Sequence, residues 1–355
     1  MNSFENTVMR LFRFGHLLLL GLFLCIFNVA AHAEELSAQR TFKLLILDSQ
    51  YGNPYDEVRT ALLQRLDEYG YVQGSNLEVQ LLVTGNDIKE GERLLLQQLD
   101  KGYDALFVGG TIATMAAKNT LFGRADIPVV FGSPTDPVGI GVINNFTEKP
   151  VSNFTGVCYP VPISARLNFI RKLLPGAKRL GVIYADMPQS HSYNAWLREA
   201  VTSDPDFEGL ELIFRSVDLV TGEEGDRAMA QAAIRHIREL DSKVDAFVKP
   251  NDQLGTRRHF SEVVYANSTK PLIGLTQADV MDGWGAAVVV YPSHESIGQQ
   301  AAEMLKQLFE GGKVADIIPQ WPAKFGFAVD LKKTRQFGIK VPIEILRLSG
   351  ENIIK

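Results

Sequence analysis

Cysteine and histidine are scarce in this sequence, which limits the kinds of site that it can form. Two cysteines occur among 355 residues, and only Cys158 follows residue 33. We therefore expect no disulfide within the folded protein and stability from packed cores alone. No histidine after residue 33 has another histidine or a cysteine near it in sequence, so we expect no metal site. These histidines are His191, His236, His259 and His294.

Motifs for common enzyme chemistry are also missing. The sequence contains no G-x-S-x-G, no H-E-x-x-H and no G-x-x-x-x-G-K motif, which are typical of hydrolases, zinc proteases and phosphate-binding loops. Gly139-Ile140-Gly141 lacks the third glycine of a dinucleotide-binding loop and does not open a helix pattern. We therefore expect no cofactor, no catalytic residue and no enzyme activity.

Charge of neither sign dominates the chain. It has 36 Lys and Arg residues against 41 Asp and Glu residues, a formal net charge of −5. This mildly acidic balance argues against binding to nucleic acid or to an anionic membrane surface. Beyond residue 33, no apolar run reaches the ~20 residues that a membrane-spanning helix needs.

The first 33 residues have the layout of a secretory signal peptide. Arg10 and Arg13 form a basic segment, an apolar run follows at 17–29, and residues 31–33 read AHA, a cleavage pattern. An uncleaved membrane anchor is the alternative, but the apolar run is shorter than the ~20 residues of a membrane span. Cys25 is flanked by large apolar residues, which argues against a lipid anchor. We expect a cleaved signal peptide and a periplasmic location.

Apolar runs of strand length alternate with amphipathic helical patterns along the rest of the chain. The run at 42–48 is continuously apolar, as in a strand buried on both faces, and similar runs follow it. An irregular stretch at 152–162 contains Pro160 and Pro162 and separates two such series. We therefore predict an α/β protein with two Rossmann-like lobes, each a parallel sheet with helices on both faces.

Open parallel sheets bind ligands beyond the carboxyl ends of their strands, so the residues that follow each predicted strand are the candidates for a ligand site. Gly109, Gly110 and Thr111 follow one strand and open a helix, where free backbone N–H groups favour a carboxylate or phosphate. An ordinary tight turn is the alternative. The ligand-binding candidates are Gln50, Tyr51, Gly110, Thr111, Ser133, Asp136, Tyr184, Ser190, Asp252, Thr276 and Trp284.

The acidic and aromatic candidates each have a structural alternative. Asp136 and Asp252 could meet a ligand ammonium group, or they could cap a helix or a turn. Tyr51, Tyr184 and Trp284 could stack on a ring of the ligand, or they could belong to the core. The residue types and their spacing are compatible with both interpretations.

Short stretches along nearly the whole chain after residue 33 share their pattern and order with one protein family. They are 127–131 (IPVVF) with 136–139 (DPVG) and 153–157 (NFTGV), then 174–184 (LPGAKRLGVIY), then 245–246 (DA) with 250–252 (PND), then 285–287 (GAA) with Tyr291, Ile297-Gly298, Ala301-Ala302 and Gly311, and finally 337–342 (FGIKVP) with Leu346. Together they resemble the ABC-transporter substrate-binding proteins of the tryptophan/tyrosine-binding type.

The resemblance implies a type I periplasmic-binding-protein fold, in which three crossings between the lobes act as a hinge. On this basis we place the crossings near Val157, Tyr291 and Phe325. One lobe would then comprise residues 34–156 and about 292–325. The other would comprise residues 157–291 and about 326–355. Closure of the hinge would trap the ligand.

The resemblance also implies a ligand, often an amino acid, whose carboxylate lies at Gly110 and Thr111. It identifies Asp252 with the family's acidic residue in the second lobe. Two loops depart from the family's pattern: residues 49–53 read SQYGN where relatives often carry a His-Pro element, and residues 132–134 read GSP in place of a more apolar stretch. Because these loops contain candidate ligand-binding residues, the departures affect the expected identity of the ligand and not the expected fold.

We therefore predict a monomeric periplasmic protein that captures a small amino-acid-like or carboxylate-bearing molecule and delivers it to an inner-membrane ABC permease. One alternative is a sensor whose closed form docks on a membrane receptor or kinase. Another is a secreted enzyme on the same scaffold, because fold does not determine function. Transport and sensing need the same two-state hinge, so this chain alone carries no signal that separates them.

Overall fold

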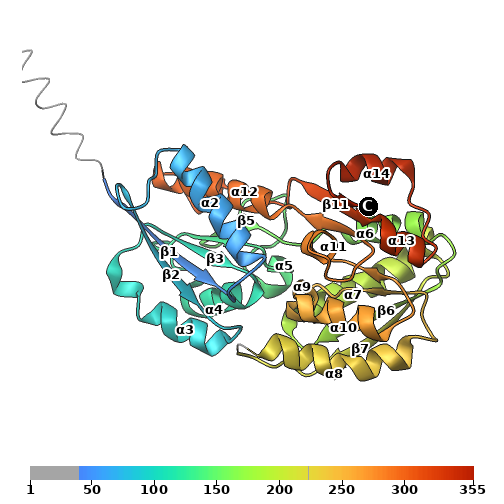
Figure 1. The fold of residues 1–355 in the computed structure, drawn as a ribbon. Coiled ribbons are helices and arrows are strands. Elements are labelled where there is room, and N and C mark those ends of the chain that lie inside the picture. The colour runs from blue at the N-terminus through green and yellow to red at the C-terminus, as the bar shows by residue number, and fades with distance from the viewer. Residues whose placement is uncertain (1–39, 223) are drawn as a thin grey trace, which may run out of the picture.

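Two sheets organise the computed structural model, which describes residues 40–222 and 224–355. The predicted signal peptide and Cys25 lie outside the described residues. The first sheet has the order β2-β1-β3-β4-β5, and all its neighbouring strands are parallel (Figure 1). Its strands are β1 (Phe42–Asp48), β2 (Leu77–Val83), β3 (Ala105–Gly109), β4 (Val129–Gly132) and β5 (Phe154–Val157).

Burial on both faces explains the continuous apolar run of β1. Leu44 and Ile46 belong to one core cluster, and Leu45 and Leu47 belong to another. Successive side chains of a strand point to opposite faces of its sheet. All four of these side chains are at most 1% exposed, so neither face is left for polar residues, as expected of a parallel sheet covered by helices.

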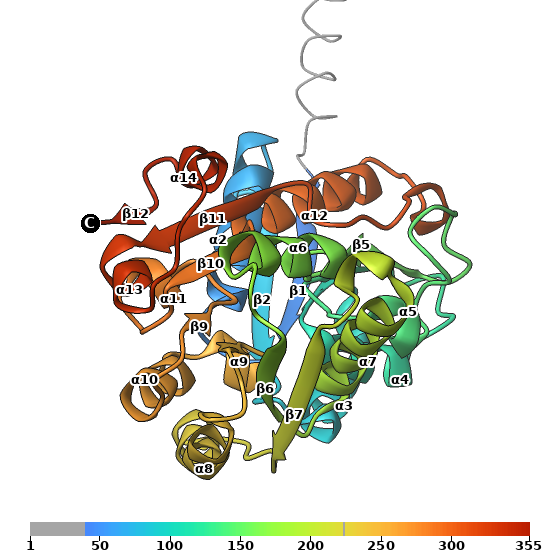
Figure 2. The same ribbon diagram turned by 90° about the vertical axis from the view of Figure 1, so that its right-hand side faces the viewer.

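Helices that are distant in sequence pack together on the first sheet. Figure 1 and Figure 2 both show α2 beside α12, and Gly298 of α12 permits this approach because a Cβ there would lie 2.3 Å from the carbonyl oxygen of Val58. We call this sheet with its helices the first lobe. Its helical segments are α2 (Tyr55–Glu68), α3 (Ile88–Leu96), η1 (Leu99–Lys101), α4 (Thr111–Leu121), α5 (Pro137–Ile140), α12 (His294–Phe309) and η3 (Val314–Asp316).

The second sheet has the order β12-β11-β10-β9-β8-β6-β7, and it forms the second lobe with its helices. Its strands are parallel except that β10 and β11 pair antiparallel. Its strands are β6 (Arg179–Ala185), β7 (Glu211–Val217), β8 (Ala246–Val248), β9 (Leu272–Ile273), β10 (Val288–Pro292), β11 (Phe325–Asp330) and β12 (Ile353–Ile354). Its helical segments are α6 (Ile163–Leu173), α7 (Pro188–Ser203), η2 (Pro205–Phe207), α8 (Gly225–Leu240), α9 (Gln253–Thr256), α10 (Arg258–Asn267), α11 (Ala278–Met281), α13 (Leu331–Gln336) and α14 (Ile343–Ser349).

The chain passes between the lobes after β5, between β10 and α12, and between η3 and β11. The last passage explains the direction of β11, since this strand enters the second sheet from the first lobe and not through a crossover helix of its own sheet. The predicted α/β architecture with two mainly parallel sheets is confirmed, and the pairing of β10 with β11 is its antiparallel exception. None of the helices in the described part of the chain has both the length and the apolar character needed to span a bilayer.

Candidate ligand-binding site

A small cavity of about 20 Å³ lies between the two lobes, beyond the carboxyl ends of strands from both sheets. Two side-chain hydrogen bonds join the lobes beside it. Asn251 Nδ2 donates to Thr135 Oγ1 (3.0 Å), and Asn86 Nδ2 donates to Gln253 Oε1 (2.7 Å). The lobes are therefore closed against each other here. The cavity is lined by Pro54, Tyr55, Thr111, Ser133, Thr135, Tyr159, Gln189, Asn251, Asp252, Gln253 and Thr256.

Gly110 shapes the first-lobe side of this cavity at the start of α4. Its φ is +89°, a backbone conformation that favours glycine. A Cβ at this position would lie 2.5 Å from Tyr55 Cε1 and 2.7 Å from Ser49 Oγ. Its own N–H donates to the carbonyl oxygen of Gly132 (2.7 Å). The strand-to-helix turn is therefore tight, and it places Thr111, the first residue of α4, in the cavity wall.

Two hydroxyl groups occupy the N-terminus of α4. Ser49 Oγ accepts a hydrogen bond from Ala113 N–H (3.0 Å) and donates to the carbonyl oxygen of Gly109 (2.8 Å). Thr111 Oγ1 accepts from Thr135 N–H (3.1 Å). A hydroxyl that accepts one hydrogen bond keeps its own proton to donate, so Thr111 can offer a proton to an acceptor in the cavity beside the positive end of the helix dipole.

Two buried polar atoms at the cavity have no hydrogen-bond partner among the described residues. They are Ser133 Oγ and Gln189 Oε1, and both side chains belong to residues only 7% exposed. Ser133 also has a φ of +66°, which is uncommon for a non-glycine residue. A buried polar atom without a partner is costly, so the site favours a ligand that can pair with these atoms.

Asp252 is the carboxylate that lines the cavity. Its Oδ1 accepts from Gly255 N–H (2.9 Å), and its Oδ2 accepts from Ala185 N–H (3.0 Å) and Ser190 Oγ (2.8 Å). Because Asp252 is buried, its pKa is raised to about 6 from 3.8, against the effect of these hydrogen bonds. A carboxylate offers about four lone-pair positions. Asp252 therefore caps α9 and keeps acceptor capacity on Oδ1 for a ligand donor.

Tyr159, on the first passage between the lobes, is held by a hydrogen-bonded series that leads to α12 and α2 of the first lobe. Its hydroxyl lies 3.2 Å from His294 Nε2, and His294 Nδ1 lies 2.6 Å from Glu57 Oε2. Burial raises the pKa of Tyr159 well above its ordinary value, so this hydroxyl stays protonated. The ring of Tyr159 is thereby fixed as one wall of the cavity.

The family model described as ABC transporter substrate binding protein matches residues 51–353. The chain belongs to this family. A tyrosine-binding protein of Clostridioides difficile (strain R20291) is 26% identical over 266 residues, which cover 74% of this chain and 71% of that relative.

Solved structures share the fold of this substrate-binding protein. A conserved domain protein from Vibrio cholerae has a TM-score of 0.75 at 21% identity, with 89% of this chain and 100% of that chain covered. An ABC domain in complex with L-Trp from Streptococcus pneumonia has a TM-score of 0.72 at 20% identity, with the same coverage. The family and the type I periplasmic-binding-protein fold predicted from the sequence are confirmed.

The structure gathers part of the predicted site residues at the cavity of this substrate-binding protein. Thr111, Ser133 and Asp252 line it, and Gly110 directly precedes Thr111. Ser190 lies behind Asp252 as its hydrogen-bond donor. These residues come from both lobes, as the strand-end argument requires.

Other predicted polar residues do not line the cavity. Gln50 Oε1 accepts from Asn86 Nδ2 (2.8 Å) at the contact between the lobes. Asp136 caps α5 by accepting from Gly139 N–H (2.7 Å). Thr276 is buried, and its Oγ1 has no hydrogen-bond partner among the described residues.

The three predicted aromatic residues do not line this cavity. Tyr51 is 68% exposed. Tyr184 packs edge-on against the rings of His191 and Phe214. Trp284 lies with its ring 5.7 Å from Lys249 Nζ. The aromatic rings in the cavity wall are those of Tyr55 and Tyr159.

Several residues that line the cavity were not among the predicted site residues. Thr135 and Asn251 follow β4 and β8, so the strand-end rule reaches both, but neither was among the predicted site residues. Tyr159 lies in the proline-containing stretch that predicted the hinge. Gln189, Gln253 and Thr256 carry no comparable sequence signal. Within residues 40–222 and 224–355, no group of three or more histidine, cysteine, aspartate or glutamate side chains is arranged to hold a metal ion.

Proposed function

We propose that this substrate-binding protein is secreted to the periplasm, captures an amino-acid-like or carboxylate-bearing molecule between its lobes, and delivers it as a monomer to an inner-membrane ABC permease. The observation that carries the proposal is the cavity between the lobes, with the N-terminus of α4 on one side and Asp252 on the other. An anion-favouring helix terminus and a carboxylate suit the two charged ends of an α-amino acid. The match to the ABC transporter substrate binding protein family supports the role.

The names of related proteins support the ligand class. One relative is called a tyrosine-binding protein, and one solved structure with the same fold is described as a complex with L-Trp. Tyr55 and Tyr159 supply aromatic rings in the cavity wall, which suits a ligand with a ring of its own. Aromatic amino acids are therefore the first ligands to test.

We propose that the lobes close as two bodies. The moving units would be residues 34–156 with about 292–325, and residues 157–291 with about 326–355. The three passages of the chain between the sheets support a hinge at these positions. In this fold, closure of such a hinge traps the ligand and presents a changed surface to the membrane partner.

We propose binding without catalysis. The one cysteine in the described part of the chain, Cys158, is buried, and burial raises the pKa of its thiol well above the ordinary value. A thiol in this state is a poor nucleophile. Asp252 is engaged by three protein donors, which suits a fixed electrostatic role better than proton transfer.

The proposal predicts a thermal shift with aromatic amino acids. A ligand at ~100 times its dissociation constant adds about 2.7 kcal/mol of stability, and so raises the melting temperature by several degrees. The protein from Glu34 onward is to be unfolded and refolded to remove bound ligand, then screened with L-tyrosine, L-tryptophan, other amino acids, nucleosides and sugars. A shift with a sugar or nucleoside but with no amino acid would contradict the proposed ligand class.

Thr111→Val is expected to weaken binding of L-tyrosine roughly tenfold or more, because a hydrogen bond to a charged carboxylate is lost. Isothermal titration would measure the dissociation constant. Thr114→Val is the matched control, since Thr114 lies on the same helix, donates to the carbonyl oxygen of Gly110 (2.7 Å) and does not line the cavity. If Thr111→Val weakens L-tyrosine and its amide analogue equally, the carboxylate does not lie at Thr111.

A further inference from the structure

A guanidinium group of the second lobe reaches the first lobe outside the ligand cavity. Arg257 lies between α9 and α10. Its Nη1 donates to the carbonyl oxygen of Asn53 (2.8 Å), and its Nη2 donates to that of Tyr51 (2.9 Å). Both acceptors belong to the first-lobe loop between β1 and α2. Thr256 lines the ligand cavity but Arg257 does not, so this contact bears on closure and not on ligand recognition.

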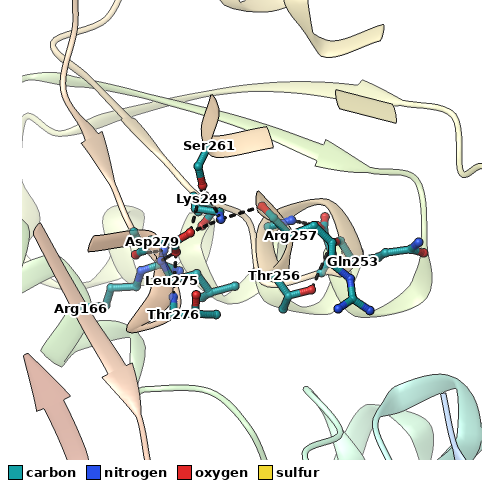
Figure 3. Close-up of polar contacts among 12 residues, drawn as sticks. Arg166, Lys249, Gln253, Thr256, Arg257, Ser261, Leu275, Thr276 and Asp279 are labelled. Carbon is teal, nitrogen blue, oxygen red and sulfur yellow. Dashed lines mark hydrogen bonds and ion pairs between the residues drawn. The ribbon is translucent and has the colours of Figure 1, made fainter. Parts of the chain in front are cut away.

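Arg257 is held firmly on its own lobe. Asp226 Oδ2, at the start of α8, lies 3.1 Å from Arg257 Nε, and the two side chains are only 17% and 13% exposed. The backbone carbonyl of Arg257 accepts from Lys249 Nζ (3.1 Å), and Lys249 is paired with Asp279 inside the lobe (Figure 3). The backbone carbonyl of Arg257 is thus hydrogen-bonded within the second lobe and its guanidinium is ion-paired with Asp226 there, while both Nη atoms extend to the first lobe.

The first-lobe loop fits this guanidinium closely. Gly52 has a φ of +82°, which favours glycine, and a Cβ there would lie 3.0 Å from Arg257 Nη1. Gly52 N–H donates to Asp56 Oδ2 (3.1 Å) in the first turn of α2. The loop is therefore tied to its own lobe in a shape that turns two carbonyl oxygens toward Arg257.

Asp226 connects this contact to a second one between the lobes. It accepts a hydrogen bond from Gln253 Nε2, and Gln253 Oε1 accepts from Asn86 of the first lobe (2.7 Å). One carboxylate thus orients both side chains, Arg257 and Gln253, that reach across. Gln253 lines the cavity and Arg257 does not, so a substitution at Arg257 isolates closure from ligand contact.

We propose that Arg257, oriented by Asp226, is a latch: a positioning residue that holds the closed form and slows ligand release without touching the ligand. The latch rests on the proposed function, because it matters only if closure traps a ligand. Its two hydrogen bonds exist only while the lobes are together, so they stabilise the closed form selectively. Contacts of this kind act on the dissociation rate more than on the association rate.

Stopped-flow binding measures the expected effect. With L-tyrosine and L-tryptophan as probes, Arg257→Ala should raise the dissociation rate constant roughly tenfold to a hundredfold, since two charge-assisted hydrogen bonds are lost. Asp226→Asn should give a smaller increase. Arg258→Ala is the matched control, because the side chain of Arg258 is 63% exposed and pairs with Glu262 within the same helix. The control should leave the rate unchanged.

A second measurement reports closure without any ligand. Spin labels at Lys89→Cys on α3 and Arg235→Cys on α8 would give the distance between the lobes by double electron–electron resonance. Arg257→Ala should shift this distribution toward longer distances, with a melting temperature equal to that of Arg258→Ala. A lower melting temperature with unchanged distances would mean that Arg257 merely packs its own lobe.

The outcomes separate the latch from the proposed ligand. If the wild-type protein binds neither probe, these two aromatic amino acids are excluded as its ligands, and the distance distribution still decides on the latch. If the wild type binds but Arg257→Ala changes neither the dissociation rate nor the distances, the latch is overturned. Should Arg257→Ala fail to fold, Arg257→Lys serves in its place, because lysine keeps the charge but cannot donate to both carbonyls as a planar fork.

Discussion

Replacing Asp279 with alanine is expected to lower the free energy of unfolding by about 3–5 kcal/mol, the usual cost of breaking a buried ion pair by removing one partner. Asp279 and Lys249 are both 0% exposed and are paired in the second lobe (Figure 3). Burial lowers the pKa of Lys249, since its charged form loses hydration. Without Asp279, the lysine must either stay charged without a carboxylate or give up its proton, and both are costly.

Asp279 also holds a turn that a mutation would release. Its Oδ2 accepts from the backbone N–H groups of Leu275 (2.8 Å) and Thr276 (2.9 Å), directly after β9. Its Oδ1 accepts from Ser261 Oγ (2.9 Å) on α10. The substitution therefore leaves several buried donors unpaired at once, each of which adds to the cost.

Urea unfolding followed by tryptophan fluorescence measures this loss. Two controls define its origin. Lys149→Ala breaks an ion pair with Asp316 whose side chains are 67% and 63% exposed, and it should change stability by ~1 kcal/mol or less. The double variant Lys249→Met/Asp279→Leu should lose less than Asp279→Ala, because it leaves no unpaired charge. A single-variant loss no larger than that of Lys149→Ala would contradict the role of the pair.

The two mainly parallel sheets could be predicted from the sequence because strands that are buried on both faces appear as continuous apolar runs. Within the strand Phe42–Asp48, residues 44–47 are apolar at successive positions since both faces of the sheet are covered. Gly110 could be placed at a strand-to-helix turn because another glycine precedes it and a helical pattern follows it. Parallel strands end at the same edge, so the residues after them predict the region of the site.

The same rule could not fix the direction of each side chain. Tyr184 lies near the end of β6, yet its ring packs against those of His191 and Phe214 and not in the cavity wall. Successive residues of a strand point to opposite faces of the sheet, so a position near the strand end does not by itself place a side chain in the site. The contact of Asn251 with Thr135 joins residues 116 positions apart and depends on how far the lobes close. Lys249 and Arg166 are buried cations, which no apolar pattern predicts.

Lowering the pH through about 6 is expected to weaken binding of an amino acid, and Asp252→Asn is expected to reduce this dependence. Asp252 has its pKa raised to about 6 by burial. Above that pH its carboxylate is charged and attracts the ligand ammonium. Below it, the carboxyl group is protonated and neutral, so the attraction is lost, and each further pH unit should raise the dissociation constant by up to about tenfold.

Isothermal titration with L-tyrosine from about pH 4.5 to 8 would measure this profile. Asp252→Asn should bind more weakly at the upper end of this range, by roughly tenfold or more since a charge-assisted contact is lost, and should lose the part of the pH dependence that belongs to Asp252. The amide introduced by this substitution can still accept from Gly255 N–H through its carbonyl oxygen. Its nitrogen cannot accept from Ala185 and Ser190, so the melting temperature of the variant should be recorded beside each titration.

A second buried carboxyl group, that of Asp48, makes it necessary to repeat the titration with a ligand that lacks the ammonium group. Asp48 has its pKa raised to about 7 by burial, against the effect of its ion pair with Arg59, and it does not line the cavity. Protonation of Asp48 would alter the first lobe and weaken every ligand alike. The desamino analogue of tyrosine, which keeps the ring and carboxylate but lacks the ammonium, separates the two carboxyl groups. If its affinity falls below about pH 6 as steeply as that of L-tyrosine, Asp252 is a helix cap and not the ammonium partner.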